Sequence, residues 1–179
     1  MNTASAFNFL ISSIFDFYSF VLLARFLFQL TKADFYNPVS QFVLRITDGL
    51  LNPLRKILPQ SKSVDSASLI MLFVTQILKH YLVVFIVLHL TPNPLQALIA
   101  GLFGVASIMV NFFLFALFIQ AIGSWFAQGG YNPFLALLNQ VTEPLVAPVR
   151  KLFPPMSGFD FSVMIVATLL FFVKILFQL

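Results

Sequence analysis

The segment YNPVSQFVLRITDGLLNPLRKILP, residues 36–59, occurs a second time as YNPFLALLNQVTEPLVAPVRKLFP, residues 131–154. The two copies align without a gap at a constant spacing of 95 residues. The same register continues outside them, where the aligned pairs are Asp16 and Asn111, Asp65 and Asp160, and Lys79 and Lys174. Self-similarity at a fixed period indicates a duplicated structural unit. The repeated unit is therefore longer than the motif itself.

The composition is that of a membrane protein. Hydrophobic residues make up 60% of the chain and charged residues 9%, whereas a soluble domain is about half apolar and about one quarter charged. The chain has no cysteine, which excludes disulfides and thiolate metal sites. The net charge of +4 comes from few basic residues set among apolar runs, so we expect no nucleic-acid partner.

Four apolar segments are long enough to cross a bilayer, which takes roughly 20 helical residues. They are Phe7–Leu30, Ser66–Leu90, Pro94–Ile122 and Phe161–Leu179. The first has no basic region before it and no small-residue cleavage pattern, so we interpret it as a retained helix and not a signal peptide. The sequence predicts an all-α integral membrane fold with four transmembrane helices.

The basic residues outside these segments predict the topology. All of them follow the first or the third segment: Lys32, Arg45, Arg55, Lys56, Lys62, Arg150 and Lys151. The positive-inside rule then places residues 31–65 and 123–160 in the cytoplasm, and both termini and the connection 91–93 on the periplasmic side. Residues 1–92 and 93–179 would form two tandem repeats of the same orientation, which is a parallel arrangement.

Each repeat carries an amphipathic helix between its two spans, predicted over residues 38–59 and 133–154. Its apolar side in the first copy consists of Val39, Val43, Ile46, Leu50, Leu54 and Ile57, with apolar residues at the same six positions of the second copy. Such a helix lies flat in the membrane interface. Pro53, and Pro144 with Pro148, predict a break or kink followed by a short second helix that Pro59 and Pro154 end.

Asp65 and Asp160 come directly before the second span of each repeat. Either carboxylate can cap the following helix. Each can also turn back onto the Arg-Lys pair of its motif and clamp the amphipathic helix to the span. The two roles are compatible.

The motif residues resemble those of the YggT family of small bacterial inner-membrane proteins, which is related to the YlmG proteins of plastids. The matching positions are Pro53, Arg55, Lys56, Pro59 and Asp65, and Pro148, Arg150, Lys151, Pro154 and Asp160. The resemblance implies a four-span inner-membrane protein. It also implies links to osmotic and potassium homeostasis, to cell division, or to cytochrome assembly, because members have been linked to each.

Ionisable residues inside spans are the best leads to function in a membrane protein. Asp16 and Lys79 lie at similar depths, about 15 Å from the outer ends of their helices, and we predict that they pair. Asn111 and Lys174 take their places in the second repeat. Lys174 would then be neutral, paired across the repeats, part of an anion site or, as we favour, directed to the outer headgroups. Arg25 reads as an interfacial anchor.

Two histidines and a run of small residues are the remaining candidates for a functional site or a contact surface. His80 and His89 are predicted on one helix, on different faces and too far apart to share an ion, so we expect no metal and no cofactor. No motif indicates a catalytic site, so the protein is not expected to be an enzyme. The small residues of segment 97–107 allow close helix approach, either between the repeats or between subunits of a homo-oligomer: Ala97, Ala100, Gly101, Gly104 and Ser107.

The predicted function is that of a non-enzymatic scaffold, assembly factor or osmotic and ion homeostasis factor of the inner membrane. Arg55, Lys56, Arg150 and Lys151 would contact anionic lipid headgroups or a membrane-protein partner. One alternative is an oligomeric channel or transporter component, with Asp16, Lys79, Asn111 and Lys174 around a polar path. A second alternative, haem handling in cytochrome assembly, rests on the resemblance and the two histidines.

Overall fold

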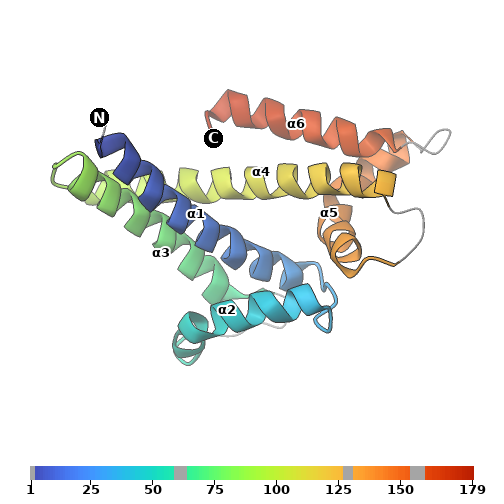
Figure 1. The fold of residues 1–179 in the computed structure, drawn as a ribbon, viewed down its shortest axis with the longest axis horizontal. Coiled ribbons are helices and arrows are strands. Elements are labelled where there is room, and N and C mark those ends of the chain that lie inside the picture. Colours follow the sequence, from blue (N-terminus) through green and yellow to red (C-terminus); the bar gives the residue numbers. More distant parts are fainter. Residues whose placement is uncertain (1–2, 59–63, 127–130, 154–159) are drawn as a thin grey trace.

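The computed structural model describes residues 3–58, 64–126, 131–153 and 160–179, with side chains up to residue 123 in the second of these ranges. All regular structure in this part of the chain is helical, which confirms the all-α prediction. The elements are α1 (Thr3–Leu30), α2 (Pro38–Arg55), α3 (Ser66–Leu82) continued by the π-helical turn η1 (Val83–Val87), α4 (Pro94–Phe126), α5 (Pro133–Leu152) and α6 (Phe161–Phe177) (Figure 1).

Three of the helical segments are long and apolar enough to cross a membrane: Thr3–Leu30, Ser66–Val87 and Pro94–Gly123. The fourth predicted span corresponds to α6, which is apolar but has 17 residues. At 1.5 Å per residue this helix is about 25 Å long, which is at the lower limit for a bilayer crossing.

Each repeat contributes a pair of long helices, α1 with α3 and α4 with α6, which pack against each other. The repeats meet where α4 packs on α3 and α1, so that α4 lies between this pair and α6 (Figure 1). Helices α2 and α5 lie near the ends of α1 and α4 and contact each other. There the Asn37 side chain donates to the carbonyl of Pro133 at 2.7 Å.

Short polar side chains fix where α2 and α5 begin. The carboxamide oxygens of Asn37 and Asn132 accept hydrogen bonds from the backbone N–H groups of Val39 and Phe134, both at 2.9 Å. A proline follows each asparagine at the first helical position, where its missing N–H costs nothing. The Asn-Pro dipeptide of the repeated motif is therefore a helix start signal in both copies.

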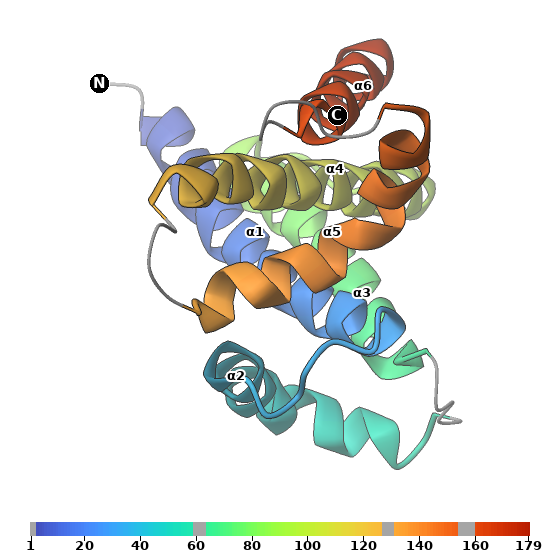
Figure 2. The same ribbon diagram turned by 90° about the vertical axis from the view of Figure 1, so that its right-hand side faces the viewer.

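The prediction of a separate second helix after the internal prolines is wrong. Helix α2 continues through Pro53, and α5 continues through Pro144 and Pro148. A proline removes one backbone hydrogen bond and crowds the preceding turn, and a helix held by tertiary contacts absorbs this by bending. Figure 2 shows α5 curving toward α6 over its last turns. Pro59 and Pro154, the predicted helix stops, lie outside the described residues.

The apolar residues of α2 are divided between two environments. Val43 and Leu51 are buried, together with Ser40 and Thr47. Phe42 is 62%, Ile46 40% and Leu50 52% exposed. The apolar periodicity therefore identified the helix, but only part of its apolar surface faces the protein interior.

Small residues of α4 provide the close contact between the repeats. A Cβ atom added at Gly101 would lie 2.7 Å from Cγ1 of Ile77, and one at Gly104 would lie 2.5 Å from Oε1 of Gln76. Helix α3 therefore occupies the surface that we predicted for repeat packing or a subunit interface. The small-residue surface of α4 therefore serves the packing between the repeats. Helix α3 leaves no room for another chain at these glycines.

Replacement of Gly101 by alanine should destabilise the protein by about 1–3 kcal/mol, the usual cost of overpacking a tight contact. The control is Gly49→Ala, because a Cβ atom at Gly49 meets nothing within 4 Å. That change should be neutral or stabilising by up to about 1 kcal/mol, since alanine favours the helix. Thermal unfolding in detergent compares the two variants, and equal effects would contradict the close contact.

Candidate functional site

A buried arginine holds the first repeat together at the motif end of its helices. Arg25 of α1 is 3% exposed. Its Nη2 lies 2.7 Å from Oδ1 of Asp48 on α2, and its Nε lies 3.5 Å from Oδ2 of Asp65 at the start of α3. Its Nη1 donates to the carbonyl of Leu44 at 3.1 Å and to the hydroxyl of Thr47. One side chain thus connects all three helices of the repeat.

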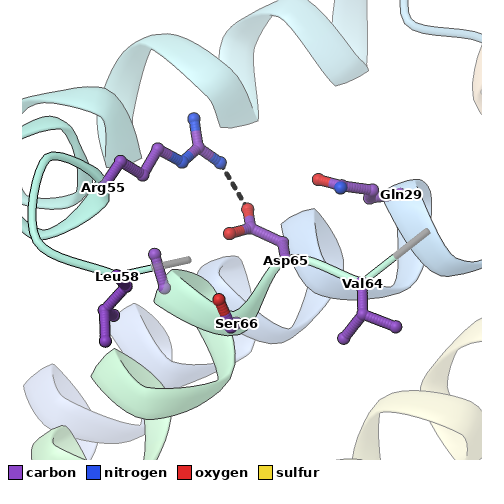
Figure 3. Close-up of a pocket in the computed structure, with 7 residues that line it drawn as sticks. Gln29, Arg55, Leu58, Val64, Asp65 and Ser66 are labelled. Atoms are coloured by element: carbon purple, nitrogen blue, oxygen red, sulfur yellow. Dashed lines mark hydrogen bonds and ion pairs between the residues drawn. The ribbon is translucent and has the colours of Figure 1, made fainter. Parts of the chain in front are cut away.

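Asp65 acts both as a cap and as a clamp. Its carboxylate accepts hydrogen bonds from the backbone N–H and the hydroxyl of Ser68, at 3.2 and 2.7 Å, and pairs with the Arg55 guanidinium (Figure 3). Burial works against the charged carboxylate, but the hydrogen bonds from Ser68 and the charge of Arg55 outweigh it, so the pKa of Asp65 lies below its usual value. Asp65 therefore stays ionised at neutral pH.

A small cavity opens beside this carboxylate. Its volume is about 150 Å³, and Figure 3 shows Asp65 and Arg55 meeting across it. It is lined by Gln29, Arg55, Leu58, Val64, Asp65, Ser66 and Ala67. The cavity wall carries both the Asp65 carboxylate and its partner Arg55.

The second repeat builds a related cluster in which several residues differ. Arg150 lies 2.9 Å from Glu143 and 2.9 Å from Asp160, the counterparts of Asp48 and Asp65. Burial opposes its charge, but hydrogen bonds to Glu143 and Asp160 outweigh burial, so the pKa of Arg150 is raised above its usual value. Gln120 stands where the first repeat has Arg25, and it donates to Thr142 at 2.6 Å. Thr142 is the counterpart of Thr47.

These clusters change the roles predicted for the arginines. Arg25 was predicted to be an interfacial anchor, which is wrong, because α2 and α3 bury it. Arg55 and Arg150 pair with Asp65 and Asp160, as the predicted clamp requires, and their contact with lipid or a partner stays a prediction. Their neighbours Lys56 and Lys151 are exposed.

A second set of polar contacts lies near the middle of the long helices. Lys79 Nζ lies 2.6 Å from Oδ1 of Asp16, as their equal depths predict. Gln76 extends this contact, since its Nε2 donates to Asp16 at 3.3 Å and to Ser19 at 2.9 Å. The Gln76 Oε1 atom is buried without a hydrogen-bond partner.

The second repeat has the matching contact. Lys174 Nζ donates to Oδ1 of Asn111 at 2.6 Å. Our preference for a Lys174 directed to the outer headgroups is therefore wrong. Lys174 binds the amide oxygen of Asn111 on α4, whereas Lys79 binds the carboxylate of Asp16 at the corresponding position of α1.

The two histidines do not share a helix. His80 lies in α3, whereas His89 lies beyond η1 with a φ of 53°, in the left-handed region. Within the described ranges, no group of three or more His, Cys, Asp or Glu residues is arranged to hold a metal ion.

Comparison with known proteins gives the family. The sequence model of CCB3/YggT matches residues 4–86 and again residues 99–179, once in each repeat. The chain belongs to the CCB3/YggT family. No solved structure matches this YggT-family chain.

Several relatives of this family cover most of the chain. The uncharacterized protein YggT of Escherichia coli K12 is 37% identical over 174 residues, which are 97% of this chain and 88% of that protein. The uncharacterized protein PA0392 of Pseudomonas aeruginosa is 40% identical over 163 residues, 90% of this chain and 82% of that protein. The names of these YggT relatives assign no activity.

Sequence reasoning missed three of the polar contacts in this YggT-family chain. It did not connect Arg25 with Thr47, Gln120 with Thr142, or Gln76 with Asp16. A signal was available for the first two, because the repeat alignment places a polar residue at both positions in both copies. Gln76 offered none, since the second repeat has Phe171 there.

Proposed function

We propose that this protein is a non-enzymatic scaffold of the bacterial inner membrane. It has four spans in two parallel repeats, and α2 binds anionic lipid at the cytoplasmic surface. One observation carries this proposal: α2 leaves an apolar surface uncovered next to free basic side chains. The family match and the apolar helices support a membrane location.

The uncovered apolar surface of α2 and its extension consists of Phe42, Ile46, Leu50 and Ile57, the last of which is 82% exposed. A fully buried side chain of this size contributes roughly 1.5–3 kcal/mol. A basic residue near an anionic membrane contributes about 1 kcal/mol. The apolar surface therefore provides most of the binding energy, and charge adds a preference among lipids.

The basic side chains available for headgroups do not include Arg55. Arg55 is held by Asp65, so its charge is used within the protein. Arg45 and Lys56 are exposed on the polar side of α2 and its extension. In the proposed orientation these two residues meet anionic headgroups.

Helix α5 has a different role despite the same sequence pattern. Leu137 and Val141, the counterparts of Phe42 and Ile46, are both 1% exposed. They belong to the hydrophobic core that includes α1 residues. We therefore assign lipid contact to α2 and a structural role to α5.

Spin labels on single cysteines test the position of α2, and the chain has no native cysteine to remove. In reconstituted vesicles, labels at Ile46 and Leu50 should be more accessible to oxygen than to a water-soluble nickel complex. A label at Asn52, on the polar side, should show the reverse. Equal behaviour of the Ile46 and Asn52 labels would overturn the proposed membrane contact.

The lipid preference has its own readout. Adding phosphatidylglycerol to phosphatidylcholine vesicles should move the Ile46 label deeper, and Arg45→Gln with Lys56→Gln should abolish this response. An unchanged depth would show that the contact is apolar only and would remove the anionic-lipid part of the proposal.

Ion conduction is the second candidate, and one observation favours it. The unpartnered Oε1 of Gln76 lies in a polar group with Asp16, Ser19 and Lys79. The second repeat has Phe171 in place of Gln76 and Leu114 in place of Ser19, so the polar group is not duplicated. If the protein conducts ions, vesicles that contain it should show an ion flux, and Lys79→Met should abolish this flux. Absence of flux in the unmodified protein would favour the scaffold.

A further inference from the structure

The contact between the two repeats is built from two different surfaces. On α3 it uses Phe73, Gln76 and Ile77, which face Gly101 and Gly104 of α4. Because α4 is the counterpart of α1, the second helix of one repeat meets the first helix of the next. A contact of this kind between unlike surfaces is heterologous, and each repeat can in principle make it at both ends.

The last helix of the chain carries the corresponding positions in an uncovered form. The counterparts of Phe73, Gln76 and Ile77 on α6 are Thr168, Phe171 and Phe172. Gln76 is 1% exposed, but Phe171 is 53% and Phe172 62% exposed. Thr168 is exposed as well. No chain segment takes the place on α6 that α4 takes on α3, among the helices that the structure describes.

The first helix of the chain carries the positions that correspond to the α4 side of this contact, and they are also uncovered. Ala6, Phe9, Ser13 and Phe17 of α1 are the counterparts of α4 residues that face the first repeat. Phe17 is 69% exposed, whereas its counterpart Phe112 is 3% exposed. Both halves of the inter-repeat contact are thus open at the outer ends of the molecule.

We propose that a second copy of this chain docks head to tail, with the α1 surface of one copy on the α6 surface of the other. The α1 surface is Ala6, Phe9, Ser13 and Phe17, and the α6 surface is Thr168, Phe171 and Phe172. This contact would continue, from one copy to the next, the contact that the chain already makes between its own repeats. This proposal does not depend on lipid binding by α2.

The charge distribution on α1 supports a protein partner at this surface over lipid alone. Asp16 lies one turn from Ser13 on the same side of α1, and its side chain is 39% exposed. Ionisable groups inside spans normally face protein or water and not acyl chains. A second copy on the α1 surface would cover the Asp16–Lys79 pair.

The contact between copies would differ in one respect from the contact within the chain. Phe9 stands in the place of Gly104, and Phe171 in the place of Gln76. An aromatic pair therefore replaces the glycine and amide contact, so the helices lie further apart. Offset or edge-to-face packing of such a pair contributes about 0.5–1.5 kcal/mol beyond its buried area.

Cysteine cross-linking in native membranes tests the proposal. Ala6→Cys and Phe172→Cys, the counterparts of the Gly101–Ile77 contact, are expressed together on full-length chains with different epitope tags. Oxidation should give a dimer that carries both tags and disappears on reduction. Either variant alone should give little dimer, because the two surfaces are different. Absence of the mixed dimer, or equally strong dimers from a single variant, would overturn the head-to-tail contact.

The control pair is Phe7→Cys with Leu169→Cys. Phe7 and Leu169 are exposed, and so are their counterparts Leu102 and Val74. These positions therefore face outward in both repeats and lie outside the proposed contact. They should cross-link at least tenfold less, and equal cross-linking would mean random collision in the membrane and would overturn the proposal. A ten-fold ratio corresponds to about 1.4 kcal/mol.

Discussion

Replacement of Arg25 by alanine should lower the free energy of unfolding by about 3 kcal/mol. Loss of one partner from a buried ion pair leaves a charge without compensation and costs about 3–5 kcal/mol. We expect the lower end of this range, because Arg55 still pairs with Asp65 and because Asp48 is 43% exposed. Helix α2 should also lose its fixed position on α1. Unfolding in detergent, followed by circular dichroism, measures the change.

The second repeat supplies the matched control for Arg25. Gln120→Ala removes one hydrogen bond to Thr142 and no charge, so it should cost about 1 kcal/mol. Arg25→Gln should fall between the two, because glutamine can restore the contact with Thr47 but not the ion pairs. If Arg25→Ala and Gln120→Ala cost the same, the charge cluster is not what holds α2 in place.

Replacement of Lys79 by methionine should cost about 2–3 kcal/mol, because it leaves the Asp16 carboxylate unpaired inside a span. The control is Lys174→Met, whose partner Asn111 is neutral and carries no charge to strand. This change should cost less than half as much. Both variants keep the length of the side chain, so packing differences are small.

A double-mutant cycle isolates the Asp16–Lys79 pair. Asp16→Asn together with Lys79→Met should cost less than the sum of the single changes, by about 1–2 kcal/mol. The measurement is unfolding in lipid-containing detergent. Strict additivity would mean that the 2.6 Å contact contributes nothing to stability.

The features predicted best were those that local chemistry determines. The Asn37-Pro38 start of α2 follows from capping and from the fixed φ of proline. The Asp16–Lys79 pair follows from equal depth on neighbouring antiparallel helices. Both needed only the helical rise and the repeat register, and no knowledge of how the repeats pack.

The features predicted poorly depend on what covers a surface. Ile46 and Val141 occupy the same position of the same pattern, yet one is exposed and the other buried. The difference arises because the core covers the Val141 side of α5, whereas α2 contributes Val43 and Leu51 to the same core and leaves the side that carries Ile46 uncovered. Periodicity shows which side of a helix is apolar, but it does not show which side has a neighbour.

Arg25 shows the same limit for charge. A basic residue near the end of an apolar segment is usually an interfacial anchor. Here its partners Asp48 and Asp65 come from two other helices that fold onto it. Only the tertiary structure brings these three groups together.

Two parallel repeats require both copies of the motif to lie on the same side of the membrane, and single cysteines at Tyr36, Tyr131 and Asn93 test this directly. Tyr36 is 93% and Tyr131 79% exposed, so both positions are open to a membrane-impermeant maleimide. In inverted vesicles the cysteines at 36 and 131 should label and the cysteine at 93 should not, with the reverse pattern in right-side-out vesicles. Labelling of positions 36 and 131 from opposite sides would contradict the parallel arrangement.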